Sequence, residues 1–275
     1  MSTLVFLLVA LILLKVLVTW LEPRMAFFPV RGVQETPAAV SLPYVDLRIT
    51  TQDAETLHGW WLEHPEPRAQ VIFWHGNGGN LSMWMPVIVE LRRRGFSVLA
   101  VDYRGYGLST GAPSELGLYR DAAATVRQFA SRLQRPGSPV IYWGRSIGSP
   151  VAASAISLLR PSAVVLESPM PDVRSLLRTN PVLWLLSFLS SYRFPTSRFL
   201  AGYDGPLLVI HGDADSIVPF AAGQRVFRDA TSARRVFVTI PGADHNDLHI
   251  TRPDVYWPAI DEFVAGLQAP RSGTE

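Results

Sequence analysis

The sequence predicts an α/β fold with a mostly parallel eight-stranded sheet and helices packed on both of its faces. Six short apolar runs alternate with stretches of helical pattern, and two half-polar strands come before them. Strands that are apolar at consecutive positions are buried on both faces, as a parallel sheet covered by helices requires. The chain has 275 residues, 48% of them hydrophobic, which is enough for one large domain of this kind.

The first two strands are expected to form an antiparallel hairpin. Residues 44–50 (YVDLRIT) and 56–63 (TLHGWWLE) alternate between polar and apolar side chains, and the polar segment Thr51–Glu55 joins them. The later strands are predicted at residues 70–74, 97–101, 139–143, 163–167, 206–210 and 235–240. Helices are predicted at Leu81–Arg94, Ser114–Leu133, Ser146–Leu159, Ala221–Ala230 and Pro253–Leu267, with Ser114 as an N-cap.

The N-terminal segment predicts a helix that crosses a membrane once. Residues 3–21 are apolar apart from Lys15 and two threonines, and at about 1.5 Å per residue they approach the roughly 30 Å of a hydrocarbon core. A cleaved signal peptide has a basic N-terminal region and a small-x-small cleavage site, and this segment has neither. We expect an uncleaved anchor at residues 1–22, with a cleaved signal or a buried or surface helix as alternatives. Arg24 and Arg31 favour a cytoplasmic catalytic part, and the side is left open.

The remaining chain is predicted to contain one domain with one insertion. We expect a proline-containing linker at 23–43, an α/β domain at 44–268 and a flexible tail at 269–275. Residues 168–205 interrupt the alternation of strands and helices and are rich in Leu, Trp, Phe, Arg and Pro. We interpret this insertion as a small helical cap over the strand ends, whose apolar side chains either bind an acyl chain or only pack.

Composition excludes several classes of function. Basic residues exceed acidic ones by two and are scattered, so no nucleic-acid partner is expected. The absence of cysteine excludes disulfides, a thiol nucleophile and thiolate metal ligands. The six histidines occur singly with no H-E-x-x-H pattern, so we predict neither a metal site nor a cofactor.

Reactive residues follow four of the predicted strands. Ligands of an open parallel sheet bind beyond the carboxyl ends of its strands, so these segments are expected to meet at one edge. The segments are HGNGGN at 75–80, GRSIG at 144–148, HGDAD at 211–215 and PGADH at 241–245.

Three residues in these segments supply the groups of a catalytic triad. A serine hydroxyl needs a base to take its proton, and a carboxylate holds that base in the useful tautomer. Ser146, Asp215 and His245 provide these groups in the chain order Ser, Asp, His, which is the order of the α/β-hydrolase fold. Gly144 and Gly148 complete the G-x-S-x-G pattern and suit a sharp turn that exposes the serine.

The oxygen of a tetrahedral intermediate needs preorganised donors. The backbone N–H groups of Ile147, after the serine, and of Asn77, in the Gly-rich loop, are the candidates. His75 is expected to brace that loop. Asp213 and Glu167 are the rivals for the acid, and we favour Asp215 because its loop position lets it reach His245.

Several motifs resemble the membrane-anchored serine hydrolases of the α/β-hydrolase superfamily, a group that includes protein depalmitoylases and lysophospholipid or monoacylglycerol lipases. The similarity spans roughly residues 23–267 and includes an F-F-P segment after the anchor. Its motifs are HGNGGN, DYRGYGLSTG (102–111), GRSIGS, HGDADSIVP (211–219) and GADHND (242–247). The resemblance implies Ser146 as nucleophile, Asp215 as acid and His245 as base, with oxyanion contacts at Asn77 and Ile147. The cap matches this family only as a hydrophobic, proline-bearing stretch, so substrate identity is not transferred.

These observations predict a serine hydrolase that cleaves carboxylic esters or thioesters of hydrophobic acyl groups through an acyl-enzyme, without a cofactor. The expected partners are a lipid or small-molecule acyl ester and the membrane. A peptidase or amidase of the same fold is the alternative. A catalytically silent binding protein is a third reading, although silent members should lose triad residues and all three positions are filled here.

Overall fold

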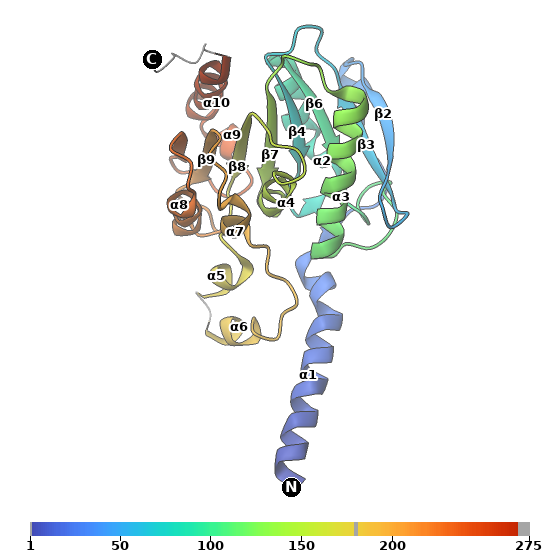
Figure 1. Ribbon diagram of the computed structural model, residues 1–275, viewed down its shortest axis with the longest axis vertical. Coiled ribbons are helices and arrows are strands. Elements are labelled where there is room, and N and C mark those ends of the chain that lie inside the picture. Colours follow the sequence, from blue (N-terminus) through green and yellow to red (C-terminus); the bar gives the residue numbers. More distant parts are fainter. Residues whose placement is uncertain (1, 179–180, 269–275) are drawn as a thin grey trace.

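The computed structural model describes residues 2–178 and 181–268. The predicted flexible tail, 269–275, lies outside the described residues. Figure 1 shows a sheet domain, a long N-terminal helix that projects from it, and a small group of short helices beside that helix.

The central sheet has eight strands in the order β10-β9-β8-β7-β4-β6-β3-β2. β2 pairs antiparallel with β3, as the predicted hairpin requires, and β3 pairs antiparallel with β6. All other neighbours are parallel, and every residue of β4 and β6–β9 is buried. The bounds are β2 Val45–Thr50, β3 Thr56–Leu62, β4 Ala69–Trp74, β6 Phe96–Val101, β7 Val140–Arg145, β8 Ala163–Glu167, β9 Leu207–Gly212 and β10 Arg235–Ile240.

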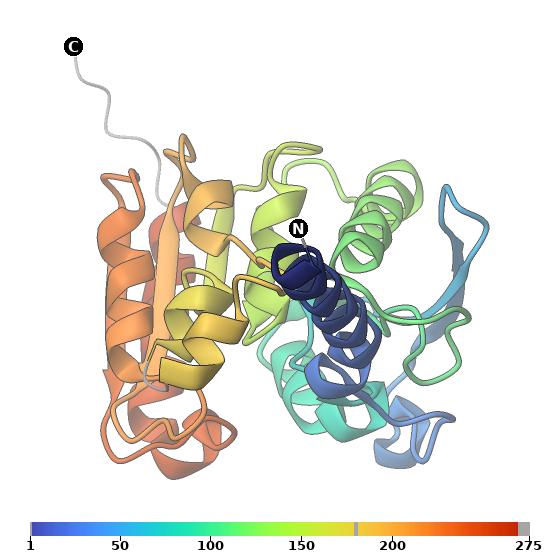
Figure 2. The ribbon, with the colours of Figure 1, turned by 90° about the horizontal axis from the view of Figure 1, so that it is seen from below.

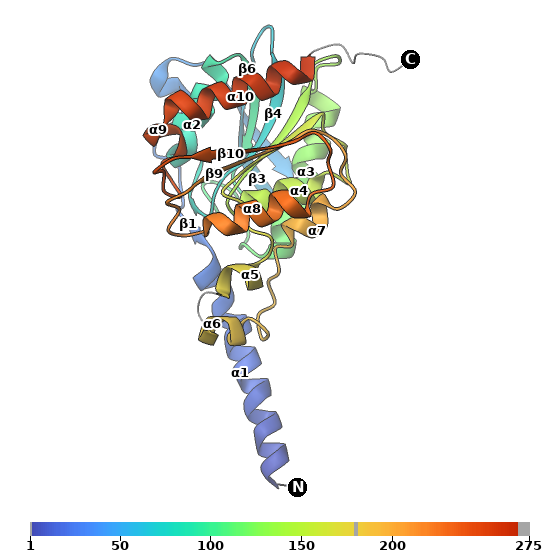
Figure 3. The same ribbon diagram turned by 90° about the vertical axis from the view of Figure 1, so that its left-hand side faces the viewer.

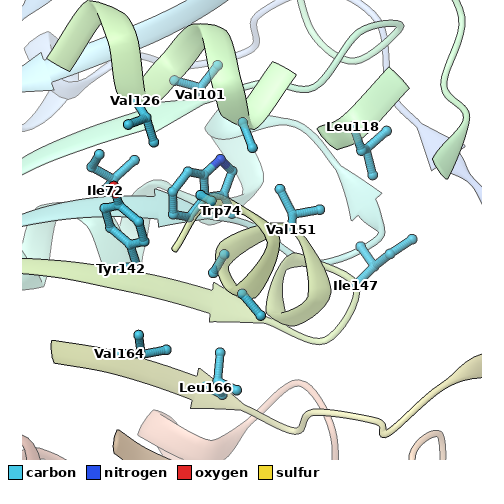
Figure 4. Close-up of a cluster of buried hydrophobic side chains, with 14 of the residues drawn as sticks. Ile72, Trp74, Val101, Leu118, Val126, Tyr142, Ile147, Val151, Val164 and Leu166 are labelled. Atoms are coloured by element: carbon cyan, nitrogen blue, oxygen red, sulfur yellow. The ribbon is translucent and has the colours of Figure 1, made fainter. Parts of the chain in front are cut away.

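Helices cover both faces of this sheet (Figure 3). α3, α4 and α8 pack on one face through residues such as Leu118, Val151 and Val226, a cluster that Figure 4 shows in part. α2 and α10 pack on the other face through Ile88 and Ile260. The bounds are α2 Leu81–Arg93, α3 Glu115–Gln128, α4 Gly148–Ala155, α8 Phe220–Asp229, α9 Leu248–Thr251 and α10 Pro253–Gln268.

Two helices, α3 and α4, differ from their predicted bounds by more than one residue, and α4 ends at Ala155 instead of Leu159. Ser114 caps α3 as predicted and accepts a hydrogen bond from the Gly117 N–H, but α3 passes into a π-helical turn, η2, at Phe129–Leu133. α4 begins at Gly148 instead of Ser146, because Ser146 has a left-handed backbone with φ of 53°. A residue in that conformation cannot continue a right-handed helix.

The N-terminal helix α1 spans Ser2–Ala26. Residues 3–26 have a mean hydropathy of 2.8 over their most apolar window, none of which is buried, so α1 is long and apolar enough to cross a membrane. α1 runs beyond the predicted anchor end at residue 22, because Pro23 lies in its last turn and removes only one donor there.

The predicted linker, 23–43, is attached to the sheet domain. Its strand β1, Phe28–Pro29, pairs in parallel with β5, Gly78–Gly79, in the Gly-rich loop. The Val30 N–H donates to the Gly79 carbonyl oxygen over 2.9 Å. A single 3-10 turn, η1 at Pro37–Val40, follows.

Within the predicted cap insertion, 168–205, the structure has three short helices: α5 Val173–Leu177, α6 Pro181–Leu186 and α7 Thr196–Leu200. The segment that follows α6 contacts α1: Lys15 Nζ donates to the Leu189 carbonyl oxygen, and the Glu22 carboxylate accepts the Ser191 N–H over 2.8 Å. Figures 1 and 3 show α6 beside α1, and Figure 2 shows the yellow cap adjoining α1 from below. We call residues 168–205 the cap below.

Candidate active site

Ser146 occupies a tight turn between β7 and α4. A Cβ on Gly144 would lie 2.3 Å from the Gly148 carbonyl oxygen, and a Cβ on Gly148 would lie 2.1 Å from the Trp74 carbonyl oxygen. Both neighbours are backbone atoms and cannot turn away, so only glycine fits on either side of the serine. The Ser146 N–H donates to the Glu167 carbonyl oxygen over 2.8 Å, which fixes the turn against β8.

The structure brings the three predicted triad residues together from three different loops. His245 Nε2 lies 3.0 Å from Ser146 Oγ, and His245 Nδ1 lies 2.8 Å from Asp215 Oδ2. Ser146 is 9% exposed and His245 is 4% exposed, so the site is largely shielded from water. The serine follows β7, the aspartate follows β9 and the histidine follows β10, all at the carboxyl edge of the sheet.

The Asp215 carboxylate is held by four groups. Oδ1 accepts the N–H groups of Ile217 and Val218, over 3.0 and 2.7 Å, and Oδ2 faces His211 Nε2 at 3.2 Å as well as His245. Burial raises the pKa of Asp215, but hydrogen bonds from His211 and His245 outweigh it and hold the pKa well below its usual range. An ionised Asp215 favours the tautomer with a proton on Nδ1 of His245, which leaves Nε2 free to accept a proton from Ser146.

The two rival carboxylates lie elsewhere. Asp213 Oδ1 accepts the Gly242 N–H over 2.7 Å. Glu167 accepts hydrogen bonds from Trp143 Nε1 and the Tyr256 hydroxyl. Of the three candidate carboxylates, Asp215 is therefore the one in contact with the His245 ring.

A further carboxylate joins the loops of the aspartate and the histidine. Asp244 Oδ1 accepts hydrogen bonds from the Ser216 N–H, over 2.8 Å, and from the His245 N–H, over 2.6 Å. Because Ser216 follows Asp215 and Asp244 precedes His245, this bridge fixes the distance between the two loops.

The two predicted oxyanion donors belong to the serine turn and to the loop after β4. Ile147 directly follows Ser146 and is the N-cap of α4. Asn77 belongs to the loop after β4, and the Tyr106 hydroxyl donates to its carbonyl oxygen over 2.8 Å. His75 is buried in the same loop, with its ring centroid 4.4 Å from that of Tyr103.

A buried arginine beneath the site was not predicted. Arg145 is 1% exposed, its Nη2 donates to the His245 carbonyl oxygen over 3.1 Å, and its Nη1 lies 3.3 Å from Glu167 Oε2. Its guanidinium carbon also lies 4.9 Å from the ring centroid of Trp84. A charged residue at the end of an otherwise apolar strand was a signal for it, because a charge there is buried and needs partners. Within 2–178 and 181–268, no group of three or more His, Asp or Glu side chains is arranged to hold a metal ion.

Comparison with known proteins agrees with this fold. A sequence profile described as serine aminopeptidase, S33, matches residues 65–205. The uncharacterized protein Rv2307c of Mycobacterium tuberculosis is 32% identical over 246 residues, covering 88% of this chain and 87% of the relative. The uncharacterized membrane protein YNL320W of Saccharomyces cerevisiae is 28% identical, covering 85% of this chain and 84% of the relative.

A solved structure is also similar. The esterase Pf2001 of Pyrococcus furiosus superposes with a TM-score of 0.71 at 25% sequence identity, covering 87% of this chain and 96% of the esterase. The chain therefore shares its overall fold with an esterase. This chain belongs to the serine aminopeptidase S33 family of α/β-hydrolase-fold proteins.

Proposed function

We propose that this protein is a membrane-anchored serine hydrolase that cleaves carboxylic esters or thioesters of hydrophobic acyl groups. The observation that carries the proposal is the position of His245, whose two ring nitrogens lie 3.0 Å from Ser146 Oγ and 2.8 Å from Asp215 Oδ2. A serine, a histidine and a carboxylate that are hydrogen-bonded in this order can generate a nucleophilic oxygen at neutral pH.

The reaction would proceed in two halves. Ser146 Oγ attacks the acyl carbonyl carbon while its proton passes to His245 Nε2, and Asp215 stabilises the imidazolium that forms. The intermediate collapses when the bond to the alcohol or thiol breaks, and His245 returns the proton to that leaving group. Water then gives a proton to His245 and attacks the acyl-enzyme, which releases the carboxylic acid and restores the serine.

Two backbone donors would stabilise the negative oxygen. Ile147 N–H adjoins the nucleophile at the start of α4, and Asn77 N–H comes from the loop that Tyr106 holds. Each such donor typically contributes about 10²–10³-fold to the rate. The left-handed backbone of Ser146 supports this role, because a sharp nucleophile turn of this kind uses the N–H after the serine as an oxyanion donor.

A hydrophobic acyl group and a membrane location are supported by the apolar parts of the chain. α1 has the length and hydropathy of a membrane span, and YNL320W is named a membrane protein. Trp184 and Phe188 of the cap are 41% and 50% exposed, as suits contact with apolar ligands.

A fluorophosphonate probe and p-nitrophenyl esters test the proposal on the full chain. Wild type should be labelled and should turn over the esters, whereas Ser146→Ala should lose labelling and nearly all turnover. Ser157→Ala is the matched control, because Ser157 Oγ donates only to the nearby Ser154 carbonyl oxygen. Labelling that persists in Ser146→Ala would count against the proposal.

Peptide or amide hydrolysis is the second candidate, because the matching family is described as serine aminopeptidase. Amide cleavage by the same residues requires His245 to protonate a leaving amine. Comparing p-nitrophenyl esters with aminoacyl p-nitroanilides separates the two, and faster turnover of the anilides would favour the peptidase.

A further inference from the structure

The cap carries an apolar surface that the sheet domain does not cover. Trp184 and Leu185 on α6 and Phe188 just after it are 41%, 66% and 50% exposed. The rings of Trp184 and Phe188 contact each other edge-on at 5.3 Å between centroids. A group of large exposed apolar side chains marks a surface that binds another apolar phase or partner.

The segment directly after this surface contacts α1. Lys15, Thr19 and Glu22 share one face of α1 and contact residues 189–191, which follow the apolar surface. Crossing about 30 Å of hydrocarbon takes about 20 residues, so a span that starts at Thr3 ends near Glu22. The contact between cap and helix, at residues 15–22, therefore lies in the C-terminal half of the span, and a bilayer around α1 must also meet α6.

The polar face of α1 fits this position. A lysine within a span needs polar partners, and here Lys15 Nζ donates to the Leu189 carbonyl oxygen. Glu22 accepts the Ser191 N–H. The cap therefore supplies the hydrogen-bond partners that Lys15 and Glu22 would otherwise lack near the hydrocarbon region.

Beside the apolar surface the cap forms a basic cavity of about 760 Å³. Trp184 contributes to its wall, so the cavity and the apolar surface adjoin. Five arginines line the cavity together with two acidic residues: Arg174, Arg178, Arg193, Arg198, Arg225, Glu115 and Asp172.

Both acidic residues of this cavity are engaged by other donors. Glu115 accepts the N–H groups of Arg193 and Phe194. Asp172 is the N-cap residue of α5 and accepts the N–H and the hydroxyl of Ser175. Among residues 2–178 and 181–268, no hydrogen-bond partner faces the buried Arg174 Nε, and its guanidinium carbon lies 4.6 Å from the ring centroid of Phe188.

The arginines therefore leave an excess of positive charge. Among the described residues, only one of the five forms an ion pair with a carboxylate, at 3.6 Å between Arg225 Nε and Asp229. Arginine forks suit phosphate oxygens, so an anionic phosphate group is the complementary ligand.

We propose that the cap docks on the bilayer beside α1, with Trp184, Leu185 and Phe188 among the acyl chains and the arginine-lined cavity on the phosphate of an anionic phospholipid. The proposal rests on the membrane anchoring proposed above. It makes the cap a second membrane contact and places the cap side of the hydrolase at the lipid surface.

Site-specific fluorescence on the full chain tests this docking, because the chain has no cysteine and each introduced one is unique. Leu185→Cys reports on the cap, Leu8→Cys on the span, and Leu158→Cys on an exposed position after α4, toward the opposite edge of the sheet. Each variant carries an NBD label in vesicles of phosphatidylcholine and phosphatidylglycerol, and nitroxide-labelled acyl chains serve as quenchers.

Strong quenching at residues 8 and 185, with little at 158, is the expected result. Quenching at 8 without quenching at 185 would overturn the docking and leave the anchor intact. No quenching at 8 would overturn the anchor and with it the docking, while the serine probe still reports on the hydrolase. A label at 185 that is blue-shifted but unquenched would mean that protein, such as a second copy, covers the surface.

The proposed preference for an anionic headgroup is tested by comparing two lipid quenchers. Nitroxide-labelled phosphatidylglycerol should quench the label at 185 more than the same amount of nitroxide-labelled phosphatidylcholine. Arg178→Gln with Arg198→Gln should reduce this preference by about fivefold per arginine. The matched control, Arg127→Gln with Arg132→Gln, removes the same charge near the other end of α3 and should keep the preference. Equal quenching by both lipids in the unsubstituted cap would overturn the phosphate site.

Discussion

Arg145 Nη2 donates a hydrogen bond to the carbonyl oxygen of His245 over 3.1 Å. Arg145 directly precedes Ser146, the proposed nucleophile. Its side chain therefore connects the serine turn to the loop that carries His245, the proposed base. The guanidinium also faces Glu167 Oε2 at 3.3 Å, and both charges are buried. A buried cation therefore links the serine turn, the histidine loop and β8.

Arg145→Met should destabilise the protein and reduce its activity. The substitution leaves the buried Glu167 charge without its cation, which is expected to lower the free energy of unfolding by about 3 kcal/mol. Adding Glu167→Gln should recover much of that stability, because the amide oxygen can still accept from Trp143 and Tyr256. Ester turnover should stay low in the double variant, since the His245 carbonyl oxygen still lacks its donor.

Urea unfolding of the single and double variants measures this coupling. A double variant whose loss of stability equals the sum of the single losses would show that the two side chains do not stabilise each other. Turnover restored to the wild-type value would show that the hydrogen bond to His245 does not position the histidine.

Gly148→Ala should disrupt the serine turn. Its Cβ would lie 2.1 Å from the Trp74 carbonyl oxygen and 2.8 Å from that of His75, so the end of β4 would have to move. We expect a loss of about 3 kcal/mol in the free energy of unfolding, at the upper end for overpacking, together with loss of probe labelling.

Gly266→Ala is the matched control for this substitution. Gly266 lies in α10, and apart from its chain neighbours and the adjacent helix backbone no described atom lies within 4 Å of an added Cβ, so alanine should stabilise the protein by about 0.5–1 kcal/mol. Thermal unfolding compares the two. A Gly148→Ala protein that is as stable as wild type and is labelled normally would contradict the steric role of that glycine.

Much of the sheet domain was predictable because its strands and helices carry local patterns. The six apolar runs and the alternating pair at 44–63 located the eight strands of the central sheet, and G-x-S-x-G with the later Asp and His segments pointed to residues that meet in the structure. These signals work because a buried parallel strand and a glycine-flanked turn each impose strict local requirements.

The contacts that were not predicted join segments far apart in the chain. Arg145 pairs with Glu167 on the neighbouring strand, β1 pairs with β5 through only two residues on each side, and Lys15 meets Leu189. None of these contacts leaves a periodic pattern in the sequence. The late start of α4 has a different cause, because the left-handed backbone of Ser146 belongs to the tight turn between β7 and α4 and not to the helix.

Asp215→Asn should change both activity and acid stability. The asparagine amide favours the wrong tautomer of His245, so kcat should fall by about 10⁴-fold. The pKa of Asp215 lies below its ordinary value of 3.8 in the folded protein, so ionised Asp215 stabilises the fold above that pH. This stabilisation disappears as the pH falls through the lower folded-state pKa, where both folded and unfolded chains are protonated.

The difference in unfolding free energy between wild type and Asp215→Asn should therefore be constant above about pH 5 and shrink as the pH falls below about 4. Urea titrations at several pH values measure it. Asp213→Asn is the control, since that side chain bonds only the Gly242 N–H and should not affect kcat strongly. A difference that grows toward low pH would reverse the assigned direction of the Asp215 pKa shift.

Glu115→Ala should loosen the cap. The Glu115 carboxylate accepts the N–H groups of Arg193 and Phe194 over 2.5 and 2.8 Å, and Phe194 has a left-handed φ of 45°. This strained backbone depends on the carboxylate, because a hydrogen bond to a charged group contributes about 1.5–3 kcal/mol. Amide hydrogen exchange at residues 193 and 194 should become at least about tenfold faster.

Glu115→Gln should give an intermediate rate, because an amide oxygen still accepts one of the two N–H groups. Glu262→Ala removes an exposed carboxylate from α10 and should leave exchange at 193 and 194 unchanged. Unchanged exchange in Glu115→Ala would mean that packing of the buried Phe194 ring alone holds the segment. Since this segment leads directly from residues 189–191, the same loosening should also weaken the contact between the cap and α1.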